Sequence, residues 1–347
     1  MPRLFPALAL AALVAALPAP LRAQDPRPAP LPEAELTRRL GDLLDSLAAK
    51  DEFSGVAVLA RNGAPVFQRA LGMADREARR ANTVETAFNL GSINKIFTQI
   101  AVRQLAAQGK LSLDSTLAAY WPDYPNAEVA RRVTIRQLLR HTSGIGGNIF
   151  DPPAGGNRRA IRRLADFLPL FVHEPLQFEP GTRNAYSNAG YVVLGLLVER
   201  LSGESYYDYL AAHIYRPAGM TRTAHYAVDS LPPNTAIGYT RGEREAPATA
   251  PLRPNSADLP GRGSSAGGGY STAADLVRFL AALRAGTIPA GPPAGVGIAG
   301  GTGGVNTVVE GALPGGYDLI VLTNLDPPAA ERVARTVRGW LGVSDPD

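Results

Sequence analysis

Strand patterns at both ends of the chain constrain its fold more than any other feature of the sequence. Two short apolar runs, 53–60 and 64–71, flank an Asn-Gly dipeptide at 62–63, which favours the tight turn of a β-hairpin. A second pair of strand-like runs, 305–310 and 317–325, lies near the C-terminus. Strands need neighbours in a sheet, so we expect one antiparallel sheet built from both chain ends and an α/β fold.

Helical periodicity occupies most of the chain between these strands. Apolar residues recur at helical spacing in 33–50 and in a segment that begins at Ser92 and ends at Gly109. Residues from about 112 to 240 are expected to be mainly helical with irregular loops. Further helices are predicted over 189–201, 272–285 and 329–341. The predicted architecture is therefore an antiparallel sheet flanked by helices, with a mostly helical insertion.

The N-terminus has the pattern of an export signal. A positive start is followed by an apolar run over 4–17 and by a small residue, Ala23, at a suitable cleavage position. The run is shorter than the roughly 20 residues that span a bilayer. We therefore expect an exported protein, periplasmic or extracellular, without stable membrane insertion after cleavage; an uncleaved anchor is the alternative. The predicted organisation is a signal peptide at 1–23, a linker at 24–33 and a single catalytic domain at 34–347, with an α/β part (34–111 and 272–347) and a mainly helical part (112–271).

Composition excludes several classes of site. The chain has no cysteine, so disulfides and thiolate metal sites are excluded. Its formal net charge is +4 without a basic block, which does not support nucleic-acid binding. Its four histidines show no metal-ligand spacing. We expect no metal and no cofactor, and a small-molecule or peptide acyl substrate as the partner; the oligomeric state stays open.

One of only three lysines follows a serine by three residues, in Ser92-Ile93-Asn94-Lys95. On a helix this spacing places both side chains on one face. The helix N-terminus would also offer free N–H groups where an oxyanion forms. A lysine with a lowered pKa can take the proton of a serine hydroxyl and make it a nucleophile. Taken alone, the pattern favours a helix-capping Ser92 and a solvated Lys95.

A second polar group directly precedes the helix predicted at 189–201. In Tyr186-Ser187-Asn188, the phenol can pass a proton to a leaving group and the amide can donate to a substrate carbonyl. The competing interpretation is a packed Tyr186 and a helix-capping Asn188. A similar tripeptide occurs at 124–126. The helix-opening position favours 186–188.

These motifs occur together with others in a fixed order over most of residues 53–325. The chain resembles the family of class C β-lactamases, D-alanyl-D-alanine carboxypeptidases and related serine esterases. The stretches that carry the resemblance are Leu90–Lys95, Leu138–Gly144, Pro180–Leu196, Arg216–Met220, Ala266–Ser271 and the strand ending at Thr323-Asn324. The resemblance implies a β-lactamase-like or penicillin-binding-protein-like fold and an acyl-enzyme mechanism.

The resemblance also implies a role for each site residue. Ser92 would form the acyl-enzyme, Lys95 would accept its proton and Tyr186 would shuttle that proton. The Asn188 amide would orient the acyl group. Backbone N–H groups of Ser92 and of the strand at Gly300-Gly301 would form the oxyanion hole. His141 matches a recurrent family position, and we interpret it as fixing the loop after its helix.

The sequence departs from the family where a Lys- or His-led triplet is usual on the strand beside the nucleophile. Here the triplet is Ile298-Ala299-Gly300, and no histidine follows His225. The preceding segment, 286–297, is also shorter than in similar proteins. Losing one charged hydrogen-bond donor removes about 1.5–3 kcal/mol, or roughly 10- to 150-fold in rate or affinity. We expect weaker recognition of substrates with a free carboxylate, and a smaller loss for neutral esters.

Two further motifs carry less weight. Residues 263–267 fit the Gly-x-Ser-x-Gly nucleophile elbow, but that mechanism needs a downstream histidine. Residues 295–300 fit a dinucleotide-binding glycine pattern, but neither a strand before it nor a helix after it is expected. The leading hypothesis is an exported serine hydrolase acting on esters or amides. The alternative is a weak or inactive relative that binds cell-wall or acyl ligands; a purely structural protein would require the motif order to be coincidental.

Overall fold

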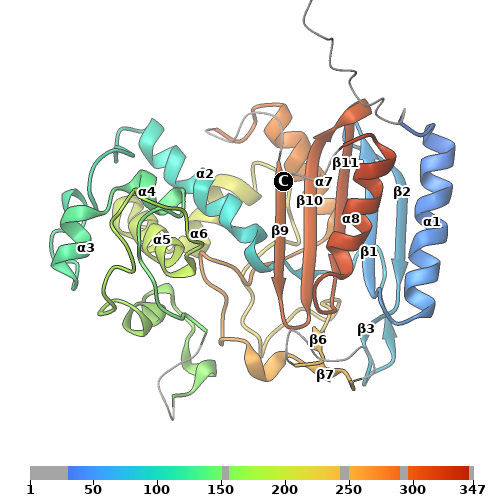
Figure 1. Ribbon diagram of the computed structural model, residues 1–347, viewed down its shortest axis with the longest axis horizontal. Helices are drawn as coiled ribbons and strands as arrows, with labels where there is room; N and C mark the ends of the chain where they lie inside the picture. The colour runs from blue at the N-terminus through green and yellow to red at the C-terminus, as the bar shows by residue number, and fades with distance from the viewer. Residues whose placement is uncertain (1–29, 151–155, 243–249, 290–295, 344–347) are drawn as a thin grey trace, which may run out of the picture.

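A computed structural model describes residues 30–150, 156–242, 250–289 and 296–343. The predicted signal peptide and most of the linker lie outside these residues. The central element is a five-stranded antiparallel sheet in the order β2-β1-β11-β10-β9 (Figure 1). Its strands are β1 (Gly55–Arg61), β2 (Ala64–Leu71), β9 (Gly297–Thr302), β10 (Val305–Leu313) and β11 (Tyr317–Thr323).

The sheet is built from both ends of the chain, which confirms the sequence prediction. β1 pairs with β11 along its whole length, from Gly55 opposite Thr323 to Arg61 opposite Tyr317. The β1–β2 turn uses Asn62 and Gly63 with φ of 53° and 83°, the left-handed region that this hairpin turn requires. Local turn chemistry thus forms the hairpin, whereas packing joins the two chain ends.

Helices cover both faces of the sheet. Along β1 the side chains alternate: Ala57 and Leu59 pack on one face, and Val56 and Val58 pack on the other. The first face is covered by α1 (Glu33–Ala49) and α8 (Ala329–Trp340), which lie side by side in Figure 1. The second face is covered by α7 (Ala273–Arg284) and by the main apolar core. Burial on both faces explains why β11 reads as a continuous apolar run.

The middle of the chain is mostly short helices and loops, as the sequence indicated. They form the part of the molecule farthest from α1 (Figure 1). The helices are α2 (Asn94–Ala107), α3 (Ala127–Arg132), α4 (Ile135–Leu139), α5 (Asn188–Ser202) and α6 (Tyr206–Leu210). Three small strand pairs lie outside the main sheet: β3 (Met73–Asp75) with β4 (Arg80–Ala81), β5 (Phe88–Asn89) with β8 (Tyr270–Ser271), and β6 (Tyr239–Thr240) with β7 (Arg253–Pro254). Of these, β5 and β8 join segments far apart in the sequence.

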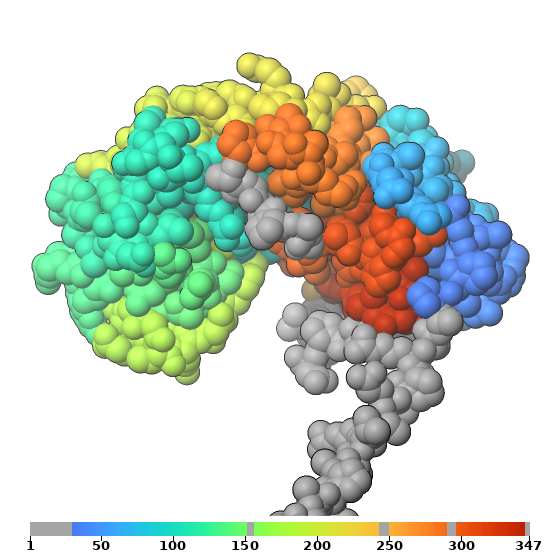
Figure 2. Space-filling model, turned by 90° about the horizontal axis from the view of Figure 1, so that it is seen from above, coloured from blue at the N-terminus to red at the C-terminus, as the bar shows by residue number. Residues whose placement is uncertain are grey.

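The residues that the structure describes lack both a membrane-spanning helix and a cluster of metal-binding side chains. None of their helices is long and apolar enough to cross a membrane. They also contain no group of three or more His, Asp or Glu side chains suited to a metal ion. The space-filling view in Figure 2 shows the surface hollowed between the helical part, teal to green, and the sheet part, orange to red.

Candidate active site

Ser92 lies in a tight turn at the junction of the sheet and the helical part. The sequence predicted an α-helix from Ser92, but residues Gly91–Ile93 form one 3-10 turn and α2 begins at Asn94. Gly91 has φ of 51°, a conformation that favours glycine. The turn is held by Thr307 of β10, whose hydroxyl donates to the Leu90 carbonyl at 2.9 Å.

Strand β9 lies directly against this turn. A methyl group on Gly300 would collide with the Leu90 carbonyl oxygen and lie 2.8 Å from the Ser92 backbone nitrogen. Similarly, a methyl group on Gly91 would lie 3.2 Å from the Gly301 nitrogen. Glycine at these positions therefore brings the two backbones together. The N–H groups of Ser92 and Gly301, predicted from the family resemblance to form an oxyanion hole, come from these two adjoining segments.

Ser92, Lys95 and Tyr186 meet in one hydrogen-bonded group. The Tyr186 hydroxyl donates to Ser92 Oγ at 2.6 Å, and Lys95 Nζ lies 3.2 Å from the same oxygen. The Lys95 nitrogen also lies 4.6 Å from the centre of the Tyr186 ring. Lys95 and Tyr186 are 91 positions apart in the sequence (186 − 95), but they meet in the fold because α2 packs against α5. The helix-cap alternative for Ser92 does not describe this arrangement.

Lys95 is buried, with 3% of its surface exposed. Its amine donates to Asn188 Oδ1 at 2.8 Å and to the Ala266 carbonyl at 2.5 Å. Burial lowers the pKa of Lys95 to about 7, so a large fraction of the amine is neutral near neutral pH. A neutral amine has two N–H groups and one lone pair. Asn188 and Ala266 take both N–H groups, which leaves the lone pair for the Ser92 hydroxyl.

Tyr186 is a poorer candidate for the resting base. Burial raises the pKa of its phenol, and the hydrogen bond to Ser92 opposes that change only in part. The phenol therefore stays protonated and donates to Ser92, while the neutral Lys95 amine can accept. The geometry therefore gives a proton path from Ser92 to Lys95, with Tyr186 as a second hydrogen-bond partner of the same oxygen.

The His141 ring packs against the Tyr186 ring. Its ring lies between the rings of Tyr186 and Tyr191, with centroid distances of 4.7 Å and 4.9 Å. Its Nδ1 accepts the Ser187 N–H at 3.1 Å, so the ring proton of neutral His141 is on Nε2. Burial and the nearby Lys95 charge lower the pKa of His141 to about 4. The imidazole therefore stays neutral where Lys95 titrates.

Ile298 is the residue that the family resemblance predicts at the position of a cation or imidazole. Side chains alternate along a strand, so Ile298 lies on the same face of β9 as Gly300, toward the nucleophile turn. It is partly buried and packs against the main apolar core. This face of β9 therefore presents an aliphatic side chain beside the site.

A cavity of about 320 Å³ opens beside Ser92. Its wall includes backbone of the glycine-rich segment 263–268 and of β9 at Gly301. Apolar side chains form much of the remaining lining: Ile149, Phe150, Phe167, Val228, Leu259 and Pro260. The charged residues in the lining, Arg253 and Asp258, are paired with each other at 2.8 Å. The cavity suits an uncharged, largely apolar group.

The structure also decides between the competing sequence motifs. Ser265, the serine of the Gly-x-Ser-x-Gly match, is fully buried and donates to the Tyr191 carbonyl at 2.7 Å. Tyr124 is buried, and Asn126 caps α3. The cap of α5 is Ser187, which leaves Asn188 free to contact Lys95. The motif at 186–188 is therefore the one that reaches the nucleophile.

Sequence reasoning missed several contributors to the site. The Ala266 carbonyl accepts from Lys95, yet the family-like stretch at 266–271 gave no reason to single out a carbonyl. Asn94 lies between the two site residues of its motif and accepts the Gly269 N–H at 2.8 Å, which ties that stretch to α2. The apolar cavity wall comes from loops without any recognisable pattern. A sequence signal existed only for the glycine-rich stretch itself.

Comparisons with known proteins agree on the family and on the fold. The Beta-lactamase family model matches residues 40–321. The chain is 33% identical over 231 residues to PbpX of Bacillus subtilis (strain 168), whose name describes it as a penicillin-binding protein. This match covers 67% of this chain and 55% of PbpX. The chain is 32% identical over 290 residues to esterase EstB of Burkholderia gladioli, covering 75% of this chain and 73% of EstB. A penicillin-binding protein structure from Bacillus halodurans has a TM-score of 0.73 at 30% identity, covering 85% of this chain and 99% of that one. The chain thus spans little more than half the length of PbpX.

Proposed function

Because this chain belongs to the β-lactamase family of serine hydrolases, we propose that it is an exported enzyme that cleaves esters or amides through an acyl-enzyme on Ser92. The observation that carries the proposal is the buried Lys95 amine, 3.2 Å from a serine hydroxyl that also accepts a hydrogen bond from Tyr186. A solvated lysine would stay protonated at neutral pH and could not act as this base.

The proposed reaction has two halves. In the first, Lys95 accepts the Ser92 proton as Oγ attacks the substrate carbonyl carbon, and the N–H groups of Ser92 and Gly301 stabilise the oxyanion. The carbon–leaving-group bond then breaks, and the leaving alcohol or amine takes a proton through Tyr186. In the second half, water attacks the acyl ester, the acid is released and Ser92 regains its proton. Asn188 holds Lys95 and can donate its amide N–H to the acyl group.

We propose that neutral acyl groups are preferred over groups with a carboxylate next to the scissile bond. Ile298 offers no charge to such a carboxylate, and Arg253 at the cavity wall is already paired with Asp258. Hydrolysis of a neutral 4-nitrophenyl ester should exceed that of penicillin by well over tenfold in kcat/KM. Efficient penicillin turnover would contradict the preference.

The second candidate function is ligand binding with little or no turnover. Ile298 and the short connection between α7 and β9 favour it, because both remove parts that the family uses around the nucleophile. α7 ends at Arg284 and β9 begins at Gly297. Residues 290–295 of this connection lie outside the described residues.

Covalent labelling separates the two candidates. The purified chain is treated with a fluorophosphonate and weighed by mass spectrometry, and turnover of a neutral ester is measured in parallel. We expect one adduct, none on Ser92→Ala, and full labelling of Ser265→Ala, in which the rival motif serine is removed. A labelled chain without ester turnover supports the binding candidate. No adduct at all contradicts the acyl-enzyme.

Export and maturation are proposed from the signal-like segment alone. The test is the mass of the chain recovered from the periplasm or medium of an expressing bacterium. Cleavage after Ala23 gives a mature chain that begins at Gln24. Retention of the full-length chain in the cytoplasm would contradict this proposal and leave the chemistry at Ser92 unaffected.

A further inference from the structure

A second pocket lies beside the catalytic cavity. Its volume is about 410 Å³, and it shares three wall residues with the cavity at Ser92: Val228, Leu259 and Tyr270. The rest of its wall combines an apolar part with polar groups. The other lining residues are Arg159, Asp229, Leu231, Ala236, Ile237, Gly238, Asn255 and Ser256. The two spaces are therefore neighbours separated by a thin, mainly apolar wall.

Arg159 is the cation of this pocket that has no partner. Among the described residues, its guanidinium makes no ion pair and no side-chain hydrogen bond, although it is only partly exposed. Its backbone is fixed in a 3-10 turn, Arg158–Ala160, where its N–H donates to Asn157 Oδ1 at 2.9 Å. The guanidinium of Arg159 is therefore available to an acceptor in the pocket that its residue lines, and its planar fork matches the geometry of a carboxylate.

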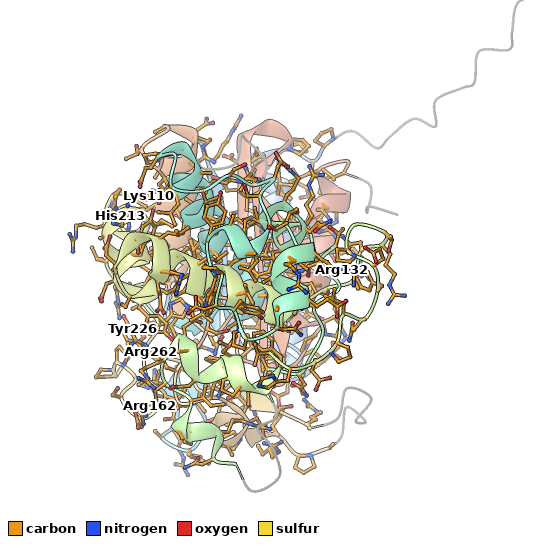
Figure 3. All side chains as sticks on the ribbon, turned by 90° about the vertical axis from the view of Figure 1, so that its left-hand side faces the viewer. Lys110, Arg132, Arg162, His213, Tyr226 and Arg262 are labelled. Atoms are coloured by element: carbon orange, nitrogen blue, oxygen red, sulfur yellow. The ribbon has the colours of Figure 1, made fainter. Side chains whose placement is uncertain are left out.

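The neighbouring arginines are already engaged. Arg162 forms a two-pronged pair with Asp229, which lowers the pKa of that carboxyl. Arg262 donates to the His225 carbonyl at 2.7 Å and lies over the Tyr207 ring. Both arginines are labelled along one edge of the helical end in Figure 3. Because Arg162 neutralises Asp229, the pocket keeps the single positive charge of Arg159.

The charge of Arg159 acts on two other residues of the pocket lining, Tyr270 and Asp229. Burial raises the pKa of Tyr270 to about 12, and the Asn89 hydrogen bond and the Arg159 charge both oppose that rise. The same charge contributes to the lowered pKa of Asp229. The guanidinium therefore lies close enough to both lining residues to affect their pKa values.

We propose that this pocket binds a carboxylate carried on a short apolar body, with Arg159 as its ion-pair partner. The planar guanidinium matches a carboxylate in two parallel hydrogen bonds, and the Ser256 hydroxyl lines the same space. One unpaired cation balances one carboxylate, whereas a dianionic phosphate carries a second negative charge that no other cation among the described lining residues matches. The apolar residues accommodate the body of the ligand. Ile298 on β9 offers no charge to a carboxylate close to the scissile bond, whereas Arg159 binds a carboxylate that lies farther from that bond.

The carboxylate has two sources: a substrate whose far end carries it, or a free carboxylic acid. Only the first rests on the proposed hydrolase function. The binding arm of the test therefore uses Ser92→Ala, which has no nucleophile, and measures hexanoate and its neutral counterpart hexanamide by calorimetry. We expect hexanoate to bind at least tenfold more tightly at low salt, with the difference shrinking as salt is raised.

Arginine variants decide whether Arg159 is responsible. In the Ser92→Ala background, Arg159→Gln should remove the preference for hexanoate, whereas Arg131→Gln, on the exposed surface of α3, should retain it. Equal binding of the two ligands would overturn the proposal. A hexanoate preference that survives Arg159→Gln would also overturn it.

The kinetic arm distinguishes the sources and uses the chain with Ser92 intact. The mono-4-nitrophenyl ester of a dicarboxylic acid is compared with a neutral 4-nitrophenyl ester of the same length. If the substrate supplies the carboxylate, Arg159→Gln raises KM about tenfold for the anionic ester only. If hexanoate binding depends on Arg159 but Arg159→Gln changes the KM of neither ester, the ligand is a free carboxylic acid. Binding without turnover of either ester would count against the hydrolase function and support the pocket.

Discussion

The imidazole of His141 stacks on the phenol ring of Tyr186, with ring centroids 4.7 Å apart and planes inclined by 28°. The Tyr186 side chain is 58% exposed, although protein groups around its hydroxyl desolvate the phenol, and the Lys95 amine lies 4.6 Å from the centre of the same ring. The hydroxyl at the end of this ring is the group that donates to Ser92. The position of the proton donor therefore depends on a side chain that contacts neither the nucleophile nor the cavity.

Replacing His141 by asparagine separates this stacking from the fold. His141 has φ of 58°, a region that asparagine tolerates, and the amide oxygen can still accept the Ser187 N–H. Only the stack is lost, so we expect kcat to fall about tenfold or more with an unchanged urea unfolding midpoint. Full activity of His141→Asn would show that Tyr186 is positioned by other contacts.

The activity should depend on pH through Lys95. The neutral amine is the proposed base, and its pKa is lowered to about 7. Lowering the pH protonates it, so kcat/KM for a neutral ester should rise with pH and reach half its plateau near pH 7. In Lys95→Arg the cation cannot lose its proton, and we expect a loss of at least about a thousandfold. If kcat/KM instead rises with a midpoint near pH 4, the group whose titration controls the activity is His141.

The approach of β9 to the nucleophile turn makes a prediction with a matched control on the same strand. A methyl group at Gly300 collides with the Leu90 carbonyl, whereas at Gly297 it meets nothing within 4 Å. Gly300→Ala should move the Gly301 N–H away from Ser92 and lower kcat about a hundredfold. The kcat of Gly297→Ala should stay within about twofold of the kcat of the unmodified chain. Equal kinetics of the two variants would exclude Gly301 as an oxyanion donor.

A buried ion pair links α7 to the sheet. The Asp318 carboxylate is fully buried, and Arg284 donates to it at 2.7 Å. Arg284→Met leaves this carboxylate without its partner, so the free energy of unfolding in urea should fall by about 2–3 kcal/mol, less than for a fully buried pair because the arginine is partly exposed. Arg38→Met, which breaks exposed pairs on α1, should change it far less. Similar effects of the two variants would show that burial of Asp318 is unimportant.

The sequence by itself determined the local elements. Asn62-Gly63 defines one turn, and Gly203, with φ of 79°, ends α5 close to the predicted residue. The three-residue spacing of Ser92 and Lys95 also places them together, although a 3-10 turn at the start shifted the predicted helix boundary. Such features depend on a few consecutive residues, so periodicity and turn chemistry reveal them. The catalytic roles themselves stay predictions.

Tertiary structure alone decided which distant groups meet. The partners of Lys95 lie at 188 and 266, and the strand against Ser92 lies some two hundred residues later. The stacking of His141, the burial that lowers the Lys95 pKa and the unpaired Arg159 have no sequence signature. Each results from packing of segments far apart in the chain, where desolvation and close contact are properties of the folded core and not of any one segment.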